Sequence, residues 1–397
     1  MQQYLEQQAN TIEQVLADHG ISVRVVGGTL SPRLVHFGLE LPRGMRLAGV
    51  TPALPALAER LGVEAVRLAP DADSGAPTLE VPRPDPVPVR LLPLARDVAE
   101  IAPPCTATLG QDVSGAPVLL RLDAPEVGPV LVSGDAGAGK SALLRSMAIS
   151  LALHNGPDTL RLLLIDLSGP ARRAVRGGTW DDMAALPHHV GEIVREPQEA
   201  KLRLRWAARL ATSRAELAAE GAPIEGAHLV VLIDGLDALL RSRDADEVAG
   251  TLAEIAAGRE LGVQLVAAAS NPRLGEALPW GGRVVGRMPN AAAATDAAGV
   301  RGTGAEGLLG KGDFLAVLGG DVVRLQAGFA TAAEVARTVT LLAECAGERL
   351  APAASRRAGW GAARPALGNT NDNDAPAQRR GLWKAQRAGV RLLKSGS

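Results

Sequence analysis

A glycine-rich stretch of eight residues constrains this chain more than any other feature. It reads Gly134-Asp-Ala-Gly-Ala-Gly-Lys-Ser141, follows the apolar residues 129–133 and opens into a helical pattern. A strand, a glycine loop and a helix in this order are typical of a P-loop, because backbone N–H groups converge on a phosphate only where no β-carbon intervenes. A loop that merely turns the chain is the alternative, and the full pattern with both flanking elements disfavours it.

The residue types of this stretch predict a nucleotide site with a metal ion. The helix that follows the loop directs the positive end of its dipole at the anion. We expect Lys140 to reach the β and γ phosphates and the Ser141 hydroxyl to bind Mg²⁺, so ATP and Mg²⁺ are the expected cofactors. The expected nucleotide-binding residues are Gly134, Asp135, Ala136, Gly137, Ala138, Gly139, Lys140 and Ser141.

Length and charge limit the possible functions. The 397 residues suffice for two or three domains with substantial cores. A net charge of −1 gives no overall attraction to nucleic acid, so DNA contact would depend on local patches or on a ring of subunits. No apolar run is long enough to span a membrane and no leader pattern precedes residue 20, so we expect a cytoplasmic protein without an integral membrane segment. Two lone cysteines suggest neither a disulfide framework nor a metal site.

The pattern along the chain divides it into four parts. Residues 1–95 alternate helical and strand patterns and predict a small α+β domain. Residues 96–345 alternate buried strands with helices, which is typical of a parallel sheet flanked by helices, with strands expected at 130–133, 162–166, 229–234 and 264–269. We expect a flexible linker at 346–378 and a basic tail at 379–397. If helical, the tail would be basic and amphipathic and would suit phosphate, membrane or a partner groove; a disordered solubilising tail is the alternative.

A second nucleotide motif ends the apolar strand His228 to Asp234. An acidic residue at the carboxyl end of a strand beside a P-loop completes the Mg²⁺ coordination, so Asp234 is the expected metal-shell and catalytic carboxylate. Asp166 ends a neighbouring predicted strand by the same logic. A turn-capping role is the alternative for Asp166, because an aspartate that ends a strand often caps the next turn.

Several spaced motifs together resemble the FtsK/SpoIIIE family of DNA translocases over about residues 5–342. The motor region matches through Leu109-Gly-Gln-Asp112, the P-loop, Leu-Ile-Asp166, Leu186-Pro-His188, Leu204-Arg-Trp206, Ile233-Asp234, Gly258-Arg259 with Gly262, and Leu309-Gly-Lys-Gly-Asp313. The amino-terminal part resembles the small domain that precedes this motor, through Val25 to Pro32, Leu39 to Pro42 and Leu79 to Pro82. The resemblance implies a RecA-like motor that forms a hexameric ring around double-stranded DNA and uses ATP at subunit interfaces.

The chain departs from this family where hydrolysis is promoted. The family's Walker B aspartate is followed by a glutamate that orients water, whereas Asp234 is followed by Gly235. Asp237 is the nearest candidate substitute, although a carboxylate misplaced by about 1 Å can cost ~100-fold in rate. The family's γ-phosphate-sensing glutamine corresponds to Ser270 here. Its basic residues that act on a neighbour's nucleotide correspond to an alanine-rich stretch at 291–298, with Arg287 close by as either a replacement or a surface arginine.

Two groups of cations are the expected DNA contacts. Lys201, Arg205 and Arg209 recur every four residues and place three positive charges on one helix face. The second group comprises Arg172, Arg173 and Arg176, which follow the Asp166 strand. A solvated helix face is the alternative for the first group, because acidic residues lie nearby.

The residues leave more than one functional hypothesis. The first is an ATP-binding FtsK/SpoIIIE-type motor that binds and translocates double-stranded DNA in chromosome segregation or DNA transfer, as a homo-hexamer or in a mixed ring with an active paralogue. Its ATP hydrolysis would be weak because of Gly235. The alternatives are a hydrolysis-deficient ring subunit or scaffold, and a secretion-system ATPase of the same superfamily.

Overall fold

A computed structural model describes residues 2–42, 44–45, 47–70, 76–169, 180–271, 278–350 and 391–393. The chain divides into two compact units. Unit 1 comprises Met1–Val89, Gln111–Gly115 and Val323–Gln326, and unit 2 comprises Arg90–Gly110, Ala116–Val322 and Ala327–Ser397.

Unit 1 is an antiparallel sheet with two helices packed on it. The strands lie in the order β1-β2-β4-β3. Ile12, Phe37 and Leu79 are fully buried in its core. Its elements are α1 (Gln2–Asp18), β1 (Arg24–Leu30), β2 (Leu34–Glu40), α2 (Leu54–Leu61), β3 (Arg67–Pro70) and β4 (Pro77–Pro82). Glu80 of β4 is buried, and its charge is met by ion pairs with Arg67 and Arg324, so the unit buries no uncompensated carboxylate here.

Within the described residues, unit 2 is built on a mixed sheet of ten strands in the order β14-β6-β5-β13-β12-β11-β7-β10-β9-β8. The strands are β5 (Thr106–Asp112), β6 (Pro117–Arg121), β7 (Val130–Ser133), β8 (Leu160–Asp166), β9 (His228–Asp234), β10 (Val263–Ala269), β11 (Gly282–Val285), β12 (Asp313–Leu318), β13 (Asp321–Ala327) and β14 (Arg391–Leu393). The α-helices are α3 (Leu91–Val98), α4 (Lys140–His154), α6 (Pro197–Ala219), α7 (Asp237–Leu240), α8 (Ala245–Ala257), α9 (Ala291–Ala298) and α10 (Ala332–Leu350).

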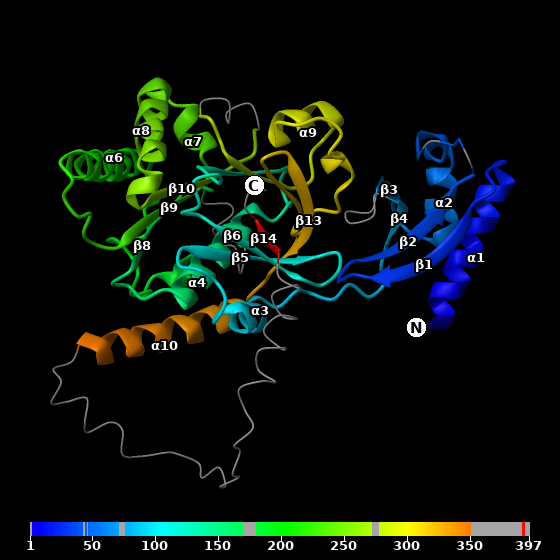
Figure 1. Cartoon of the computed structure of the whole chain (residues 1–397), viewed down its shortest axis with the longest axis horizontal. Helices are drawn as coiled ribbons and strands as arrows, with labels where there is room; N and C mark the ends of the chain where they lie inside the picture. The colour runs from blue at the N-terminus through cyan, green and yellow to red at the C-terminus, as the bar shows by residue number, and fades with distance from the viewer. Residues whose placement is uncertain are drawn as a thin grey trace, which may run out of the picture. The chain divides into compact units, whose positions relative to one another are not determined.

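The parallel core of this sheet positions the predicted site. β7, β10, β9 and β8 are parallel neighbours, and their registers align Val132, Ala268, Asp234 and Asp166 in one row across the sheet. Helices α6 and α8 pack on one face of the sheet, against alternate side chains of its strands. Helix α4 packs on the other face, and helices α3 and α10 pack against α4 (Figure 1). The four strands expected from the sequence are present, and the predicted α/β class with a small additional α+β unit is confirmed.

The carboxyl-terminal part differs from the sequence expectation in two places. Helix α10 continues to Leu350, past the boundary predicted at 345, because its helical pattern is not interrupted before Pro352. Residues Arg391–Leu393 of the basic tail form a strand that pairs in parallel with β6, so the helical interpretation is wrong for these residues. Most of the predicted linker and tail lies outside the described residues.

Helices α6 and α8 approach each other closely because of a small residue at the carboxyl end of α8. A β-carbon at Gly258, the C-cap of α8, would lie 2.5 Å from Cβ of Ala211 in α6. Real atoms do not approach so closely, so a larger residue there must force the two helices apart. Gly250, in the middle of α8, has no atom within 4 Å of such a carbon.

These two glycines give a matched test of the packing. We expect Gly258→Ala to lower the free energy of unfolding by about 1–3 kcal/mol through overpacking. Gly250→Ala should raise it by about 0.4–1 kcal/mol, because alanine loses less conformational entropy in a helix. Urea unfolding of both variants measures the difference, and equal effects would contradict the close approach.

Candidate nucleotide-binding site

The loop between β7 and α4 has the backbone that a P-loop requires. Gly134, Gly137 and Gly139 have φ angles of 157°, 81° and 108°, which favour glycine. A β-carbon at Gly134 would lie 2.8 Å from Cβ of Ala138, and one at Gly139 would lie 2.8 Å from the Gly312 nitrogen. Two of the predicted glycines are therefore needed for both conformation and space.

Lys140 is the first residue of α4 and folds back over the loop. Its side chain is buried, and Nζ donates to the backbone oxygens of Gly134 at 2.6 Å and Asp135 at 3.2 Å. The ammonium group is thus held at the mouth of the loop, beside the N–H groups of the first turn of α4, which have no acceptor within the helix. This is the arrangement in which a P-loop lysine meets a phosphate.

A second loop, Leu309 to Asp313, holds the P-loop from behind, and we call it the brace loop. The backbone N–H groups of Lys311 and Gly312 donate to the Gly137 and Ala138 oxygens at 3.0 and 2.7 Å. Because the C=O and N–H of one planar peptide point in opposite directions, the Gly139 N–H points away from the brace loop. The sequence singled out this motif, but its contact with the P-loop was not predicted.

Asp313 closes the brace loop. Its Oδ2 accepts a hydrogen bond from the Leu309 N–H at 2.8 Å, and its own N–H donates to the Gly310 oxygen at 3.2 Å. The carboxylate is buried, so this bond is shielded from water and fixes the loop shape. The two glycines of the motif, Gly310 and Gly312, have φ angles of 67° and 93°, which explains their identity.

Asp234 and Ser141 are the residues that would hold a Mg²⁺ ion. Asp234 is buried at the carboxyl end of β9, and Ser141 lies half-buried in the first turn of α4. A carboxylate and a hydroxyl are the hard oxygen donors that Mg²⁺ takes together with phosphate oxygens and water. These residues fit the ion, and when bound it would neutralise charge on the phosphates.

Asp166 caps the turn after its own strand. Its Oδ1 accepts hydrogen bonds from the Ser168 hydroxyl at 2.6 Å and the Ser168 N–H at 3.2 Å. The turn-capping alternative raised by the sequence therefore describes this residue. The N–H of the next residue, Leu167, donates to the backbone oxygen of Asp234 at 2.8 Å, so the chain after β8 runs along the end of β9.

That continuation leaves no room for a side chain after Asp234. A β-carbon at Gly235 would lie 2.8 Å from the Leu167 carbonyl carbon and 2.9 Å from its oxygen, and Gly235 has a φ of 85°. Both the space and the conformation exclude a side chain. The chain thus lacks a glutamate at this position, and its backbone also has a shape that does not accept one.

Asp237 points both carboxylate oxygens at the end of β10. Oδ2 accepts from the Ser270 N–H at 2.8 Å, and Oδ1 accepts from the Asn271 N–H at 3.0 Å. Arg241 lies 3.7 Å from the same Oδ1. These contacts assign Asp237 to holding the segment after β10, the place where the family's sensing glutamine would lie.

The predicted cationic stripe on α6 is largely used within the fold. Lys201 is buried and pairs with Asp244 at 2.5 Å, and Arg205 pairs with Glu247 at 2.5 Å, both at the beginning of α8. Lys201 also lowers the pKa of the Asp244 carboxyl, chiefly through this hydrogen bond. Arg209 is exposed. Two of the three charges are thus paired within the fold, and buried Lys201 does not match the alternative of a solvated helix face either.

The second predicted group of DNA contacts, Arg172, Arg173 and Arg176, lies outside the described residues. Of the helices in the described ranges, none combines the length and the apolarity that crossing a bilayer demands.

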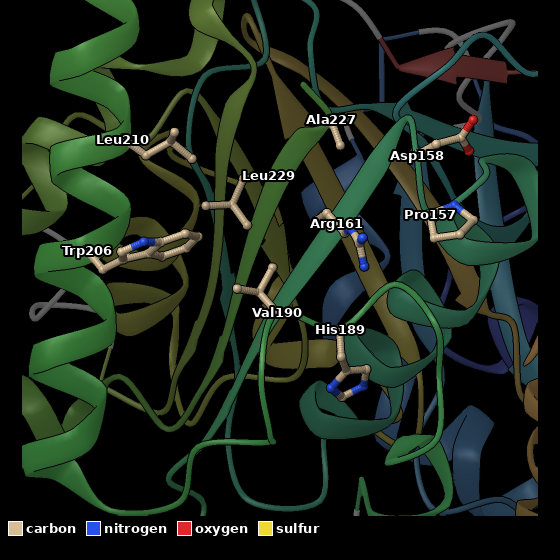
Figure 2. A pocket seen from close by; sticks show the side chains of 9 residues that line it. All are labelled: Pro157, Asp158, Arg161, His189, Val190, Trp206, Leu210, Ala227 and Leu229. Carbon is tan, nitrogen blue, oxygen red and sulfur yellow. The ribbon is translucent and has the colours of Figure 1, made fainter. Parts of the chain in front are cut away.

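A pocket of about 490 Å³ lies away from the P-loop. It is lined by Pro157, Asp158, Arg161, His189, Val190, Trp206, Leu210, Ala227 and Leu229 (Figure 2). The lining comes from the amino-terminal ends of β8 and β9, from helix α6 and from residues 189–190, whereas the P-loop follows the carboxyl end of the parallel strand β7. Burial lowers the pKa of His189. The pocket is therefore separate from the nucleotide site.

Comparison with protein families follows the division seen in the fold. Residues 96–225 match the FtsK/SpoIIIE family, and residues 1–83 match the FtsK alpha domain. The chain belongs to the FtsK/SpoIIIE family. The first match contains the P-loop, Asp166 and helix α6, and the second match lies within unit 1.

Individual relatives agree with this family. The chain is 27% identical to the DNA translocase FtsK of Clostridium tetani over 365 residues, covering 85% of this chain and 47% of that protein. It is 27% identical to the DNA translocase SftA of Bacillus subtilis over 366 residues, covering 85% of this chain and 37% of that protein. The chain thus spans less than half the length of these two relatives.

A solved structure supports the fold at low identity. The conjugation coupling protein TcpA of pCW3, determined with ATPγS, aligns with a TM-score of 0.55 at 15% identity and covers 84% of this chain and 99% of its own. At this identity the likeness shows the fold alone. The FtsK/SpoIIIE chain described here therefore has the P-loop ATPase fold that its family and its strand order imply.

Gly235→Ala tests the steric restriction after Asp234. The left-handed φ alone costs about 1–2 kcal/mol for a residue with a β-carbon. Overlap with Leu167 should add about 1–3 kcal/mol. Gly302→Ala is the matched control, because Gly302 has a φ of 75° and nothing within 4 Å of the added carbon. We expect urea unfolding to show the larger loss for Gly235→Ala, and equal losses would refute the overlap.

Asp237→Ala tests the positioning role of Asp237 without any nucleotide. Loss of both acceptors should reduce the free energy of unfolding by about 1–3 kcal/mol. Asp237→Asn keeps one acceptor oxygen and should lose less. Chemical denaturation of the nucleotide-free protein gives both values. Unchanged stability in both variants would show that the two backbone bonds contribute nothing.

Proposed function

We propose that this chain is the ATP-binding motor subunit of an FtsK/SpoIIIE-type translocase acting on double-stranded DNA, and that it hydrolyses ATP slowly by itself. The observation that carries the nucleotide part is the preformed P-loop, in which buried Lys140 is held 2.6 Å from the Gly134 oxygen. A preformed cradle avoids the cost of ordering the loop when the triphosphate binds.

The proposal of slow hydrolysis rests on the residues that follow Asp234. Water attack needs a carboxylate in position, and the backbone at Gly235 excludes a side chain there. Asp237 is engaged by two backbone N–H groups, which supports a positioning role for it. A carboxylate displaced by even about 1 Å can lose ~100-fold in rate. Binding of Mg-ATP and its turnover are therefore separable in this chain.

Two findings support double-stranded DNA as the proposed partner: the relatives of this chain are DNA translocases, and its small unit matches the FtsK alpha domain. Relatives that are DNA translocases align over 85% of this chain. The FtsK alpha domain match at residues 1–83 supports a DNA motor over a secretion ATPase. We further propose a ring of such subunits, by analogy with the family. The DNA contacts we propose are Arg209 and the predicted group Arg172, Arg173 and Arg176.

Steady-state ATPase and ATP binding of wild type and Lys140→Ala, each with and without long double-stranded DNA, test this function. We expect wild type to bind Mg-ATP and Lys140→Ala to bind about 10- to 100-fold more weakly, since a charged hydrogen bond is worth about 1.5–3 kcal/mol. Without DNA, wild-type turnover should stay below the ~1–10³ s⁻¹ usual for enzymes. Long double-stranded DNA should raise it in wild type alone.

Each part of the proposal has its own contrary result. Failure of wild type to bind ATP would remove the nucleotide site. If wild type binds ATP but neither binds DNA nor shows turnover with it, double-stranded DNA is not the partner. Fast turnover in the absence of DNA would show that another carboxylate does the work of the missing glutamate. Equal melting temperatures of the two proteins control for folding.

A further inference from the structure

A buried carboxylate oxygen of Asp166 has no hydrogen-bond partner. The side chain is removed from water, since Asp166 is only 1% exposed. Its Oδ1 accepts both hydrogen bonds from Ser168, whereas its Oδ2 accepts none from the described part of the chain. The turn after β8 therefore uses one of the two oxygens and leaves the other open to a ligand.

An oxygen of this kind is costly unless a donor or a cation meets it. A buried carboxylate oxygen loses its hydration, and without a new bond nothing replaces that loss. Elsewhere in the chain the cost is avoided, because buried Glu80 forms ion pairs with Arg67 and Arg324. Among the described residues, no lysine, arginine or histidine forms such a pair with Asp166. A bound cation, or a water molecule that a cation holds, would supply the missing partner.

The strand register places Asp166 beside Asp234. The two residues are partners in the parallel pairing of β8 with β9, at the carboxyl ends of both strands. Ile165 and Ile233, one position earlier, belong to the core under α6 and α8. Because side chains alternate along a strand, both aspartates project from the opposite face, which α4 covers. Ser141 lies in the first turn of that helix, so three oxygen-bearing side chains share one face and one edge of the sheet.

The spacing of strands suits an indirect contact between Asp166 and a Mg²⁺ ion at Asp234. Adjacent strands lie about 4.8 Å apart. A Mg²⁺–oxygen bond of about 2.1 Å and a hydrogen bond of about 2.7 Å together span about the same length. Mg²⁺ usually keeps several of its waters in protein sites. A water on such an ion is therefore within reach of a carboxylate on the next strand.

We propose that Asp166 is a positioning residue of the Mg²⁺ site, in which its Oδ2 accepts a hydrogen bond from a water molecule bound to the ion. The inference rests on the proposed nucleotide site and adds a second carboxylate to Asp234 and Ser141. The Ser168 bonds to Oδ1 hold the carboxylate in place, and its Oδ2 fixes the orientation of the water. The metal and turn interpretations of Asp166 are then compatible, because each uses a different oxygen.

The Mg²⁺ dependence of AMP-PNP binding to the full chain tests this role without any turnover. Asp166→Asn keeps one acceptor oxygen for Ser168 and replaces the other oxygen with an amide group that only donates. We expect the Mg²⁺ concentration at half-maximal binding to rise about 10- to 100-fold, the usual cost of losing an outer partner of a metal site. AMP-PNP binding in EDTA should not weaken, because no contact with the nucleotide itself is lost.

Ser168→Ala is the matched control, because it removes the hydroxyl bond to Oδ1 and leaves Oδ2 unchanged. It should not change the Mg²⁺ dependence. Asp166→Ala loses both roles and should show the same shift as Asp166→Asn, so it serves as a second variant. Electron paramagnetic resonance of Mn²⁺ in the presence of AMP-PNP repeats the comparison by measuring the free ion directly. Thermal unfolding of the metal-free variants reports the fold, and Asp166→Asn should be at least as stable as wild type, because it removes a buried charge without an ion pair.

The outcomes separate this inference from the proposed function. An unchanged Mg²⁺ dependence in Asp166→Asn and Asp166→Ala would overturn the inference and leave the nucleotide site in place. An equal shift in Ser168→Ala would assign the effect to the turn, and the inference would fail. If wild type binds AMP-PNP neither with nor without Mg²⁺, the proposed function and this inference fail together.

Discussion

The fold around the nucleotide site depends on the absence of β-carbons where three segments meet. Gly139 faces the Gly312 nitrogen, and Gly134 and Gly286 meet at Ala138, at separations that no side chain allows. Because the segments come so close, the N–H groups of the brace loop can donate hydrogen bonds of 2.7–3.0 Å to the outward carbonyls of the P-loop. Without the brace loop, those carbonyls would bond to water, and the N–H groups on the opposite side of the same peptides would no longer be held in one orientation. Burial of the strands alone could not fix this geometry.

The two sides of the site have diverged differently. On the phosphate side, the P-loop glycines, Lys140 and the brace loop together form the P-loop conformation. Lys140 bonds the Gly134 oxygen, and Asp313 fixes the brace loop through the Leu309 N–H. On the water side, the end of β8 takes the space beside Gly235, and Asp237 serves the end of β10. The phosphate side therefore has the features of a nucleotide-binding loop, whereas the water side has no space for a side chain directly after Asp234.

The sequence predicted what short patterns determine. The P-loop, the ends of the parallel strands and the α/β class follow from local periodicity and glycine spacing, and they agree with the structure. Contacts between distant segments did not follow. The regular spacing of Lys201 and Arg205 was read correctly as one helix face, but nothing local indicates that α8 supplies Asp244 and Glu247 to that face. The crowding at Gly235 likewise depends on where β8 continues, which no local pattern reveals.

The conformation at Gly235 also limits which substitutions the chain can accept. A glutamate introduced there by one mutation would meet the Leu167 backbone and an unfavourable φ, so the single substitution would lower stability. A glutamate at position 235 therefore needs the turn after β8 to move at the same time. Two coordinated changes, one in the residue and one in a turn from a different strand, are required before this position can carry a side chain.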